Sequence, residues 1–203
     1  QPTQSATPQS HRFYKVFPDG HVTAFPGAFG DILGYCAARA AGYLINGLAS
    51  VRNIAVRAIS DSEAVSQWEG TFINLGSSAS NIKTDNIKHL PENKWLLDDL
   101  GEFTFKDGRV IKIDDSGDKA IILKLVNPYF SGYSLIVCAG LGEWGGSGSA
   151  WFLSTHWRML SRRFGKEPFL IVVSVTPGSD ESAREILSYG NETLFWRMCS
   201  WFK

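Results

Sequence analysis

Residues 134–164, with the sequence SLIVCAGLGEWGGSGSAWFLSTHWRMLSRRF, carry the strongest structural signal in the chain. The apolar run 134–139 predicts a buried strand, and residues 147–164 predict an amphipathic helix. The glycine-rich stretch 140–148 lies between them. Glycines let the backbone approach a ligand closely, and free N–H groups at a helix N-terminus attract an anion. The segment therefore predicts a turn that cradles a phosphate group.

On both sides of this segment, strand and helix patterns alternate along the chain. The expected strands cover residues 11–17, 51–59, 71–75 and 169–175. The expected helices cover residues 28–48, 60–68, 180–187 and 192–201. Helices that alternate with predominantly hydrophobic strands favour a mainly parallel sheet covered on both faces. The expected fold class is therefore α/β, a three-layer sandwich.

Residues 102–126 depart from this alternation. The segments 102–105, 109–114 and 120–126 are apolar or alternate, and two short turns with the sequences KDG and SGD separate them. This pattern predicts an antiparallel three-stranded β-meander, inserted into the α/β domain.

The length of 203 residues suits a single α/β domain over residues 11–203. Residues 1–10, QPTQSATPQS, are polar and rich in Pro, Ser and Thr, and we expect them to be a disordered linker. The domain is accordingly expected to be a module of a larger protein.

The charges of the chain balance, because 20 basic and 20 acidic residues give a net charge of zero. No basic field favours binding to nucleic acid or an anionic membrane, and no apolar run approaches the roughly 20 residues that span a bilayer. Cys36, Cys138 and Cys199 lie in apolar contexts without paired spacing. This favours reduced thiols and a cytoplasmic location, with a single disulfide as the alternative.

A second small-residue turn follows another expected strand. The strand 71–75 leads into Gly76-Ser77-Ser78, and Asn81 lies shortly after it. Ligands bind beyond the carboxyl ends of strands in open parallel sheets, so adjacent strands would bring both turns to one crevice. The expected ligand-binding residues are Gly76, Ser77, Ser78, Asn81, Gly140, Gly142, Trp144, Gly145, Gly146, Ser147 and Gly148. The alternative is that both are tight structural turns that need glycine.

Two side chains inside the glycine-rich stretch carry chemistry of their own. Glu143 is the candidate catalytic carboxylate, as a base or as a ribose-binding group, and Trp144 is placed to stack on a nucleobase. The alternatives are a solvated loop charge for Glu143 and a hydrophobic plug over the sheet end for Trp144.

Several established motifs are excluded by their spacing. Gly140, Gly142 and Gly145 satisfy G-x-G-x-x-G, but the motif comes late and the next strand has no acidic residue at its end, which argues against a standard NAD(P) dehydrogenase. No Gly-Lys-Ser/Thr follows the glycines, so a Walker-type loop is absent. No G-x-S-x-G elbow occurs, and the scattered histidines predict no metal site.

The two turns together resemble those of Rossmann-like nucleotide-handling domains. They are similar to those of the SLOG and TIR-type groups, which bind or cleave nucleotide-derived ligands. In the SLOG group a Gly-Ser-Ser turn and a later glycine-rich loop flank the ligand, and Gly76-Ser77-Ser78 and Gly145-Gly146-Ser147-Gly148 match them. The proline and the threonine–glutamate pair expected around the second loop are missing. The resemblance implies a nucleotide or NAD-like ligand.

Three functions follow from these patterns. The first is a binding module for a nucleotide-derived or phosphorylated small molecule, which serves as a sensor or regulatory domain. The second is an enzyme that cleaves or transfers at an N-glycosidic bond of NAD or a nucleotide through Glu143. The third is a protein-interaction domain, in which the Trp- and Phe-rich C-terminal helices contact a second copy or other domains of the parent protein.

Overall fold

The computed structural model describes residues 14–16, 22–24, 35–49, 57–59 and 61–191. The chain divides into two units, Gln1–Ile32 and Leu33–Lys203. In the first unit, β1 (Tyr14–Val16) pairs antiparallel with β2 (Val22–Ala24), and β1 falls inside the strand expected at 11–17. The expected linker 1–10, the strand 51–56 and the helix 192–201 lie outside the described residues.

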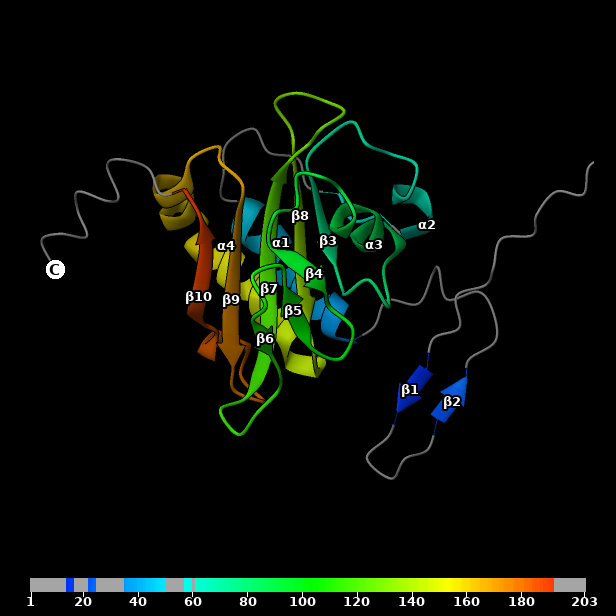
Figure 1. The fold of residues 1–203 in the computed structure, drawn as a ribbon, viewed down its shortest axis with the longest axis vertical. Helices are drawn as coiled ribbons and strands as arrows, with labels where there is room; N and C mark the ends of the chain where they lie inside the picture. Colours follow the sequence, from blue (N-terminus) through cyan, green and yellow to red (C-terminus); the bar gives the residue numbers. More distant parts are fainter. Residues whose placement is uncertain (1–13, 17–21, 25–34, 50–56, 60, 192–203) are drawn as a thin grey trace, which may run out of the picture. The chain divides into compact units, whose positions relative to one another are not determined.

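A five-stranded sheet forms the centre of the second unit (Figure 1). Its strand order is β10-β9-β7-β8-β3, so β7 lies in the middle with two strands on each side. The bounds of these strands are β3 (Phe72–Leu75), β7 (Asp118–Val126), β8 (Ser134–Gly140), β9 (Phe169–Val175) and β10 (Arg184–Gly190). The strands expected at 71–75, 134–139 and 169–175 are confirmed.

The sheet is mixed, and the expectation of a mainly parallel sheet is wrong. Among the described strands, only β3 and β8 pair in parallel, whereas β7 pairs antiparallel with both β8 and β9, and β10 pairs antiparallel with β9. The reason is the connection at 127–133, which is shorter than the dozen or so residues that a parallel crossover needs. The strand β7 therefore reverses directly into β8.

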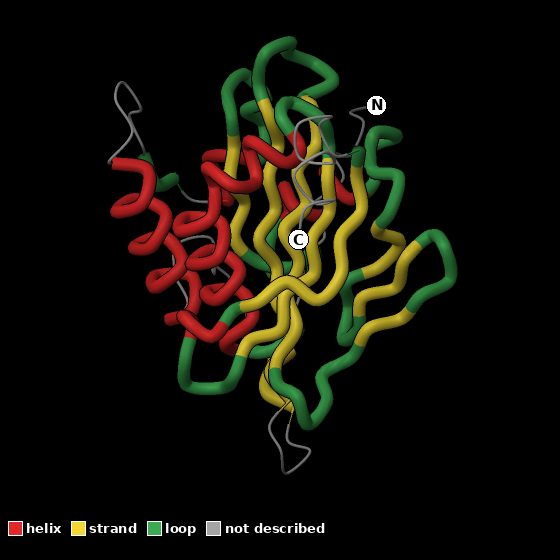
Figure 2. Tube along the Cα trace, turned by 90° about the vertical axis from the view of Figure 1, so that its left-hand side faces the viewer, coloured by secondary structure: helices red, strands yellow, loops and turns green. Residues whose placement is uncertain are grey.

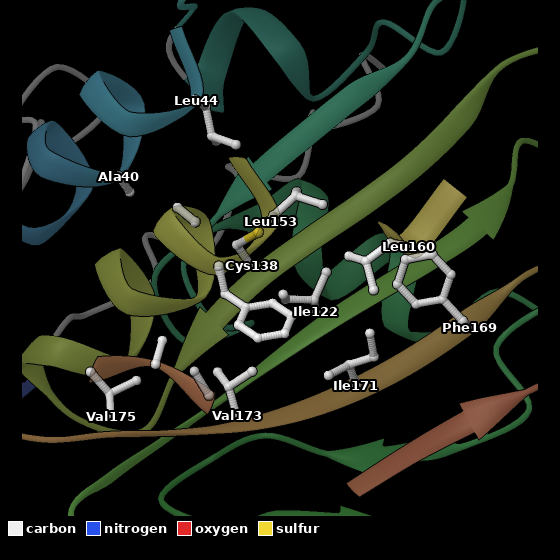
Figure 3. Close-up of a cluster of buried hydrophobic side chains, with 14 of the residues drawn as sticks. Ala40, Leu44, Ile122, Cys138, Leu153, Leu160, Phe169, Ile171, Val173 and Val175 are labelled. Atoms are coloured by element: carbon white, nitrogen blue, oxygen red, sulfur yellow. The ribbon is translucent and has the colours of Figure 1, made fainter. Parts of the chain in front are cut away.

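Two helices cover one face of this sheet, as Figure 2 shows. They are α1 (Tyr35–Ala49) and α4 (Glu143–Phe164). Side chains at alternate positions of the strands, such as Ile122 and Ile171, pack against Leu153 and Leu160 of α4 (Figure 3). Because a strand alternates its side chains between two faces, the neighbouring residues must be covered on the other side.

A second, three-stranded antiparallel sheet covers that other face, together with α3 (Ile82–Lys88). It consists of β4 (Leu96–Asp98), β5 (Phe103–Phe105) and β6 (Val110–Ile111). Phe103 and Phe105 are fully buried against Ile121 and Leu123 of β7. The second face of the main sheet is thus covered mostly by another sheet, whereas the expected three-layer sandwich has helices on both faces. The broader prediction of a mixed α/β fold is confirmed.

The predicted meander over 102–126 is wrong in its third strand. The segments at 102–105 and 109–114 do contain β5 and β6, but their partner is β4, and residues 118–126 form the centre of the main sheet. The burial of β7 explains this, because Ala120, Ile121, Ile122 and Leu123 are at most 1% exposed on both faces. An inserted meander would leave one of those faces in water.

Three helix predictions need correction. The glycine-rich stretch is not a loop, because α4 starts at Glu143 instead of residue 147. The helix expected at 60–68 is only α2 (Asp61–Ala64), and residues 57–59 form no strand. The helix expected at 180–187 is a single 3-10 turn, Asp180–Ser182, after which β10 pairs along β9.

The glycines of α4 allow it to pack closely on the sheet. A Cβ atom on Gly140 would lie 2.2 Å from the backbone nitrogen of Gly146, and one on Gly148 would lie 2.6 Å from a methyl group of Val175. Backbone atoms cannot move aside as a flexible side chain can, so Gly140 is required by the close approach of β8 and α4.

We expect Gly140→Ala to lower the free energy of unfolding by about 3 kcal/mol, because its new methyl group overlaps backbone. The matched control is Gly42→Ala in α1, where a Cβ meets nothing within 4 Å. That control should leave stability unchanged or raise it by up to ~1 kcal/mol. Urea unfolding of both variants measures the difference, and equal effects would contradict this account of the packing.

Among the described residues, Cys36 and Cys138 are free thiols, and Cys199 lies outside them. Cys138 is fully buried in β8, and burial raises the pKa of its thiol to about 12. Cys36 is half-buried in α1.

In the native protein, iodoacetamide should alkylate Cys36 and leave Cys138 unmodified, since thiolate formation and access are both suppressed there. After unfolding in urea, both should react. Peptide mass spectrometry resolves the sites, and rapid native alkylation of Cys138 would show that this region of the core opens readily.

Candidate functional site

Three strands of the main sheet end at one edge, and β7 begins there. Since β3 and β8 are parallel neighbours, with Leu75 opposite Cys138, the turns that follow them leave the sheet side by side. The strand β9 runs in the same direction, because both β8 and β9 are antiparallel to β7. We call this the carboxyl edge. The sequence predicted correctly that the two small-residue turns share it.

At the carboxyl edge, three backbone N–H groups of the glycine-rich stretch are already occupied. The carboxylate of Asp118 accepts hydrogen bonds from the N–H groups of Gly142 (2.9 Å), Trp144 (3.0 Å) and Gly145 (2.7 Å). It also accepts one from its neighbour Lys119 (2.7 Å), and Asp118 is only 5% exposed. The protein therefore fills the anion site of the helix N-terminus with its own carboxylate.

The second turn is held in the same way. Asp99 accepts a hydrogen bond from the N–H group of Ser78 (2.8 Å) and another from its hydroxyl group. The ammonium group of Lys88 donates to Ser78 Oγ (2.8 Å) and contacts Asp99 (3.1 Å) and Asp98 (3.3 Å). We call Ser78, Lys88 and Asp99 the Ser78 cluster.

The charge of Lys88 in this buried cluster is maintained by its pairing with aspartates. The side chains of Lys88 and Asp99 are 7% and 0% exposed. Burial lowers the pKa of Lys88, but Asp99 and Asp98 outweigh that effect and raise it above its ordinary value. Lys88 therefore remains a cation beside the Ser78 hydroxyl group.

The two ends of the Gly76–Asn81 turn have structural roles. Gly76 has a φ of +112°, in the region that favours glycine, and its N–H group donates to the carbonyl of Cys138 on β8. Asn81 is the N-cap of α3, where its side chain accepts a hydrogen bond from the N–H group of Thr84 (2.8 Å). Both residues thus position the Ser77-Ser78 segment.

A third polar cluster joins α1 to the start of α4. Ser147 is fully buried and donates to Asp180 (2.6 Å), which follows β9. The guanidinium group of Arg39 donates to Ser147 Oγ (2.8 Å) and to Asp180 (3.0 Å). We call Arg39, Ser147 and Asp180 the Arg39 cluster. Burial lowers the pKa of Arg39, but Asp180 and Tyr35 together outweigh that effect, and the net shift of the pKa is upward.

Aromatic rings surround the Arg39 cluster. The guanidinium group lies 4.1 Å from the ring centre of Trp144 and 4.7 Å from that of Tyr35. Tyr43 donates to Glu181 (3.1 Å), and burial, followed by Asp180 and Glu181, raises its pKa to about 12. The Nη1 atom of Arg39 is buried without a hydrogen-bond acceptor among the described residues.

The remaining predicted residues differ in exposure. Glu143 is exposed in the first turn of α4, Trp144 and Gly146 are half-buried, and Gly145, Ser147 and Gly148 are buried. The structure therefore brings the two predicted turns together at one edge. Buried packing and capping positions are occupied by Gly145, Ser147, Gly148 and Asn81, whereas Ser77, Ser78, Glu143 and Trp144 keep accessible surface.

Sequence reasoning missed the charged partners at the carboxyl edge: Arg39, Lys88, Asp99, Asp118 and Asp180. Asp118 was assigned to a hairpin turn and Asp180 to a helix, so neither suggested a site. Arg39 lies 108 and 141 positions from its two partners, and no local pattern links them. An aspartate next to a glycine at the start of a predominantly apolar strand was the one usable signal.

Other features of the described residues lie elsewhere. A pocket of about 480 Å³, lined by Trp68 and Phe130 among others, lies at the opposite end of β3 and β8. No group of His, Cys, Asp or Glu in the described ranges is arranged to hold a metal ion. Among the helices described, none is long and apolar enough to cross a membrane.

Comparisons with protein-family models, curated proteins and solved structures found no match to this chain. The Rossmann-like, SLOG and TIR-type resemblance therefore stays a prediction, and the functional argument rests on the geometry of the carboxyl edge.

We expect Asp118→Asn to lower the free energy of unfolding by roughly 2 kcal/mol, because the amide of Asn would face the N–H groups that the carboxylate accepts. The control is Asp115→Asn, an exposed neighbour in the preceding turn, which should change stability by less than about 0.5 kcal/mol. Thermal and urea unfolding of both variants give the comparison. Equal stabilities would refute the capping role of Asp118.

Proposed function

We propose that the protein is a binding module for a nucleotide-derived or other phosphorylated small molecule, held at the carboxyl edge. The supporting observation is the concentration of buried charge there: Arg39, Lys88, Asp99, Asp118 and Asp180 lie around two turns at the end of an otherwise apolar sheet. Buried charges are expensive to desolvate and tend to gather where proteins bind ligands or perform chemistry.

The phosphate in this proposal is bound by Arg39 and not by the N-terminus of α4. The N–H groups of α4 already bond to Asp118, whereas Arg39 Nη1 is a buried donor that lacks an acceptor among the described residues. A guanidinium group matches the geometry of a phosphate group, and its charge persists at every relevant pH. A ligand that supplied one oxygen would satisfy this donor.

The rest of the ligand would lie over Trp144 and the Ser77 turn. Trp144 is half-buried directly beside the guanidinium group, and an indole ring offers a surface on which a base can stack. Ser77 is half-buried at the adjacent turn and offers a hydroxyl group to a ribose. We place the domain, as a sensor or regulatory module, within a larger protein.

Binding is favoured over N-glycosidic cleavage through Glu143. A catalytic carboxylate acts in a site that surrounds the substrate and excludes water. Glu143 is exposed in the first turn of α4 and has no hydrogen-bond partner among the described residues that would orient it. The helix 192–201, on which the interaction hypothesis depends, lies outside the described residues.

Thermal unfolding with ATP, NAD, ADP-ribose and ribose 5-phosphate tests the proposal. At least one of these should raise Tm in a saturable way, and the N-glycosidic bonds of ATP and NAD should stay intact. Arg39→Lys keeps a cation beside Asp180 but removes Nη1, and we expect about tenfold weaker binding.

The matched control is Arg163→Lys, which changes a half-buried ion pair between α4 and Glu185 of β10. It should retain the affinity of the parent protein. The proposal fails when none of the four compounds shifts Tm at millimolar concentration, or when both lysine variants lose affinity equally.

A further inference from the structure

The hydrogen bonds of Ser78 go beyond what a binding turn requires. Its hydroxyl group donates to Asp99 Oδ1 and accepts from Lys88 Nζ at 2.8 Å. A nucleophilic serine needs these same two partners, a base that receives its proton and a cation that stabilises the oxygen as charge develops.

The base is itself held in place. Asp99 has no exposed side-chain surface, and its other oxygen accepts the N–H group of Ser78 at 2.8 Å. Lys88 contacts Asp99 at 3.1 Å, so base, cation and serine are mutually bonded. A nucleophile, a base and a third group that orients the base form the arrangement typical of activated serines.

The position of Ser78 in the chain adds a second, independent observation. It lies in the turn between β3 and α3, half-buried at the carboxyl edge. Ala79, the next residue, is exposed, and its N–H group forms no hydrogen bond with the described residues, so it is open to an incoming oxygen atom. In strand–turn–helix motifs that carry a nucleophile, the backbone N–H group of the next residue usually donates a hydrogen bond to the oxyanion.

We propose that Ser78 is a nucleophile that attacks the phosphorus atom of a phosphoanhydride, with Asp99 as the proton acceptor and Lys88 as the charge-stabilising cation. This rests on the proposed function only for the class of substrate. The Oγ–P bond forms, the P–O bond to the leaving phosphate breaks, and the hydroxyl proton moves to Asp99. The leaving group departs as an anion.

Water completes the cycle. A water molecule attacks the phosphoserine, the Oγ–P bond breaks, and Ser78 regains its proton from Asp99. The hydroxide of the water stays on phosphorus and its other proton is released. The chain must therefore hydrolyse a phosphoanhydride through a covalent phosphoserine at position 78.

The probe is a fluorophosphonate, which reacts with activated serines by forming an Oγ–P bond and releasing fluoride. The whole chain is incubated with it, and peptide mass spectrometry identifies the labelled residue. We expect label on Ser78, full labelling in Ser80→Ala, and none at this peptide in Ser78→Ala. The Ser80→Ala control changes an exposed hydroxyl group in the same turn.

A second pair of variants separates chemistry from structure. Asp99→Asn removes the base and should slow labelling at least tenfold, whereas Asp98→Asn removes a different carboxylate from the same lysine and should label normally. Tm values and circular dichroism show whether each variant is folded. If Asp99→Asn does not fold, the Ser78 and Ser80 variants still decide the question.

Absence of label on Ser78 in the folded parent protein overturns this proposal, as does equal labelling of Ser77. Such a result leaves the proposed function standing whenever a nucleotide still shifts Tm. Label on Ser78 without any shift by nucleotides supports the nucleophile and removes the proposed ligand.

Discussion

The carboxylate of Asp118 is the interaction on which the carboxyl edge depends. Asp118 is the first residue of the central strand β7, and its oxygens receive N–H groups from Gly142, Trp144 and Gly145 of α4. One buried side chain thus fixes where the helix begins, how closely it approaches the sheet, and where Trp144 stands. The Arg39 cluster depends on the same placement, because Ser147 lies in the next turn of α4.

Buried charged side chains gather at the carboxyl edge because the interior of the sheet is packed mostly with apolar side chains. Residues of β7 and β9 are buried on both faces of the sheet. Charged side chains and unpaired backbone groups therefore meet their hydrogen-bond partners at the ends of the strands. Each buried charge there has a specific partner: Asp118 has amides, Asp99 has Lys88, and Asp180 has Arg39. Paired charges of this kind hold a fixed geometry, which binding and nucleophilic chemistry both require.

The sequence indicated some of this structure and could not indicate the rest. Continuous apolar runs identified β8 and β9, and the helical spacing after Ser147 identified most of α4, because burial leaves a local pattern. Strand order leaves no local pattern, so β7 was assigned to a meander. For the site, the shared edge of the two turns followed from adjacent parallel strands, whereas the occupation of their N–H groups by Asp118 and Asp99 depends on contacts between distant segments.

The order of strands has a consequence for how the chain is made on the ribosome. The central strand β7 pairs only with strands that follow it in the chain, β8 and β9, while β3, made earlier, pairs with β8. During synthesis, the flank formed by β8 and β3 cannot assemble on β7 until residues 134–140 have emerged from the exit tunnel, and the flank formed by β9 and β10 cannot assemble until residues 169–190 have emerged. Until then both apolar faces of β7 are exposed to solvent. Residues 118–126 are therefore the segment of the nascent chain that would most need protection by a chaperone.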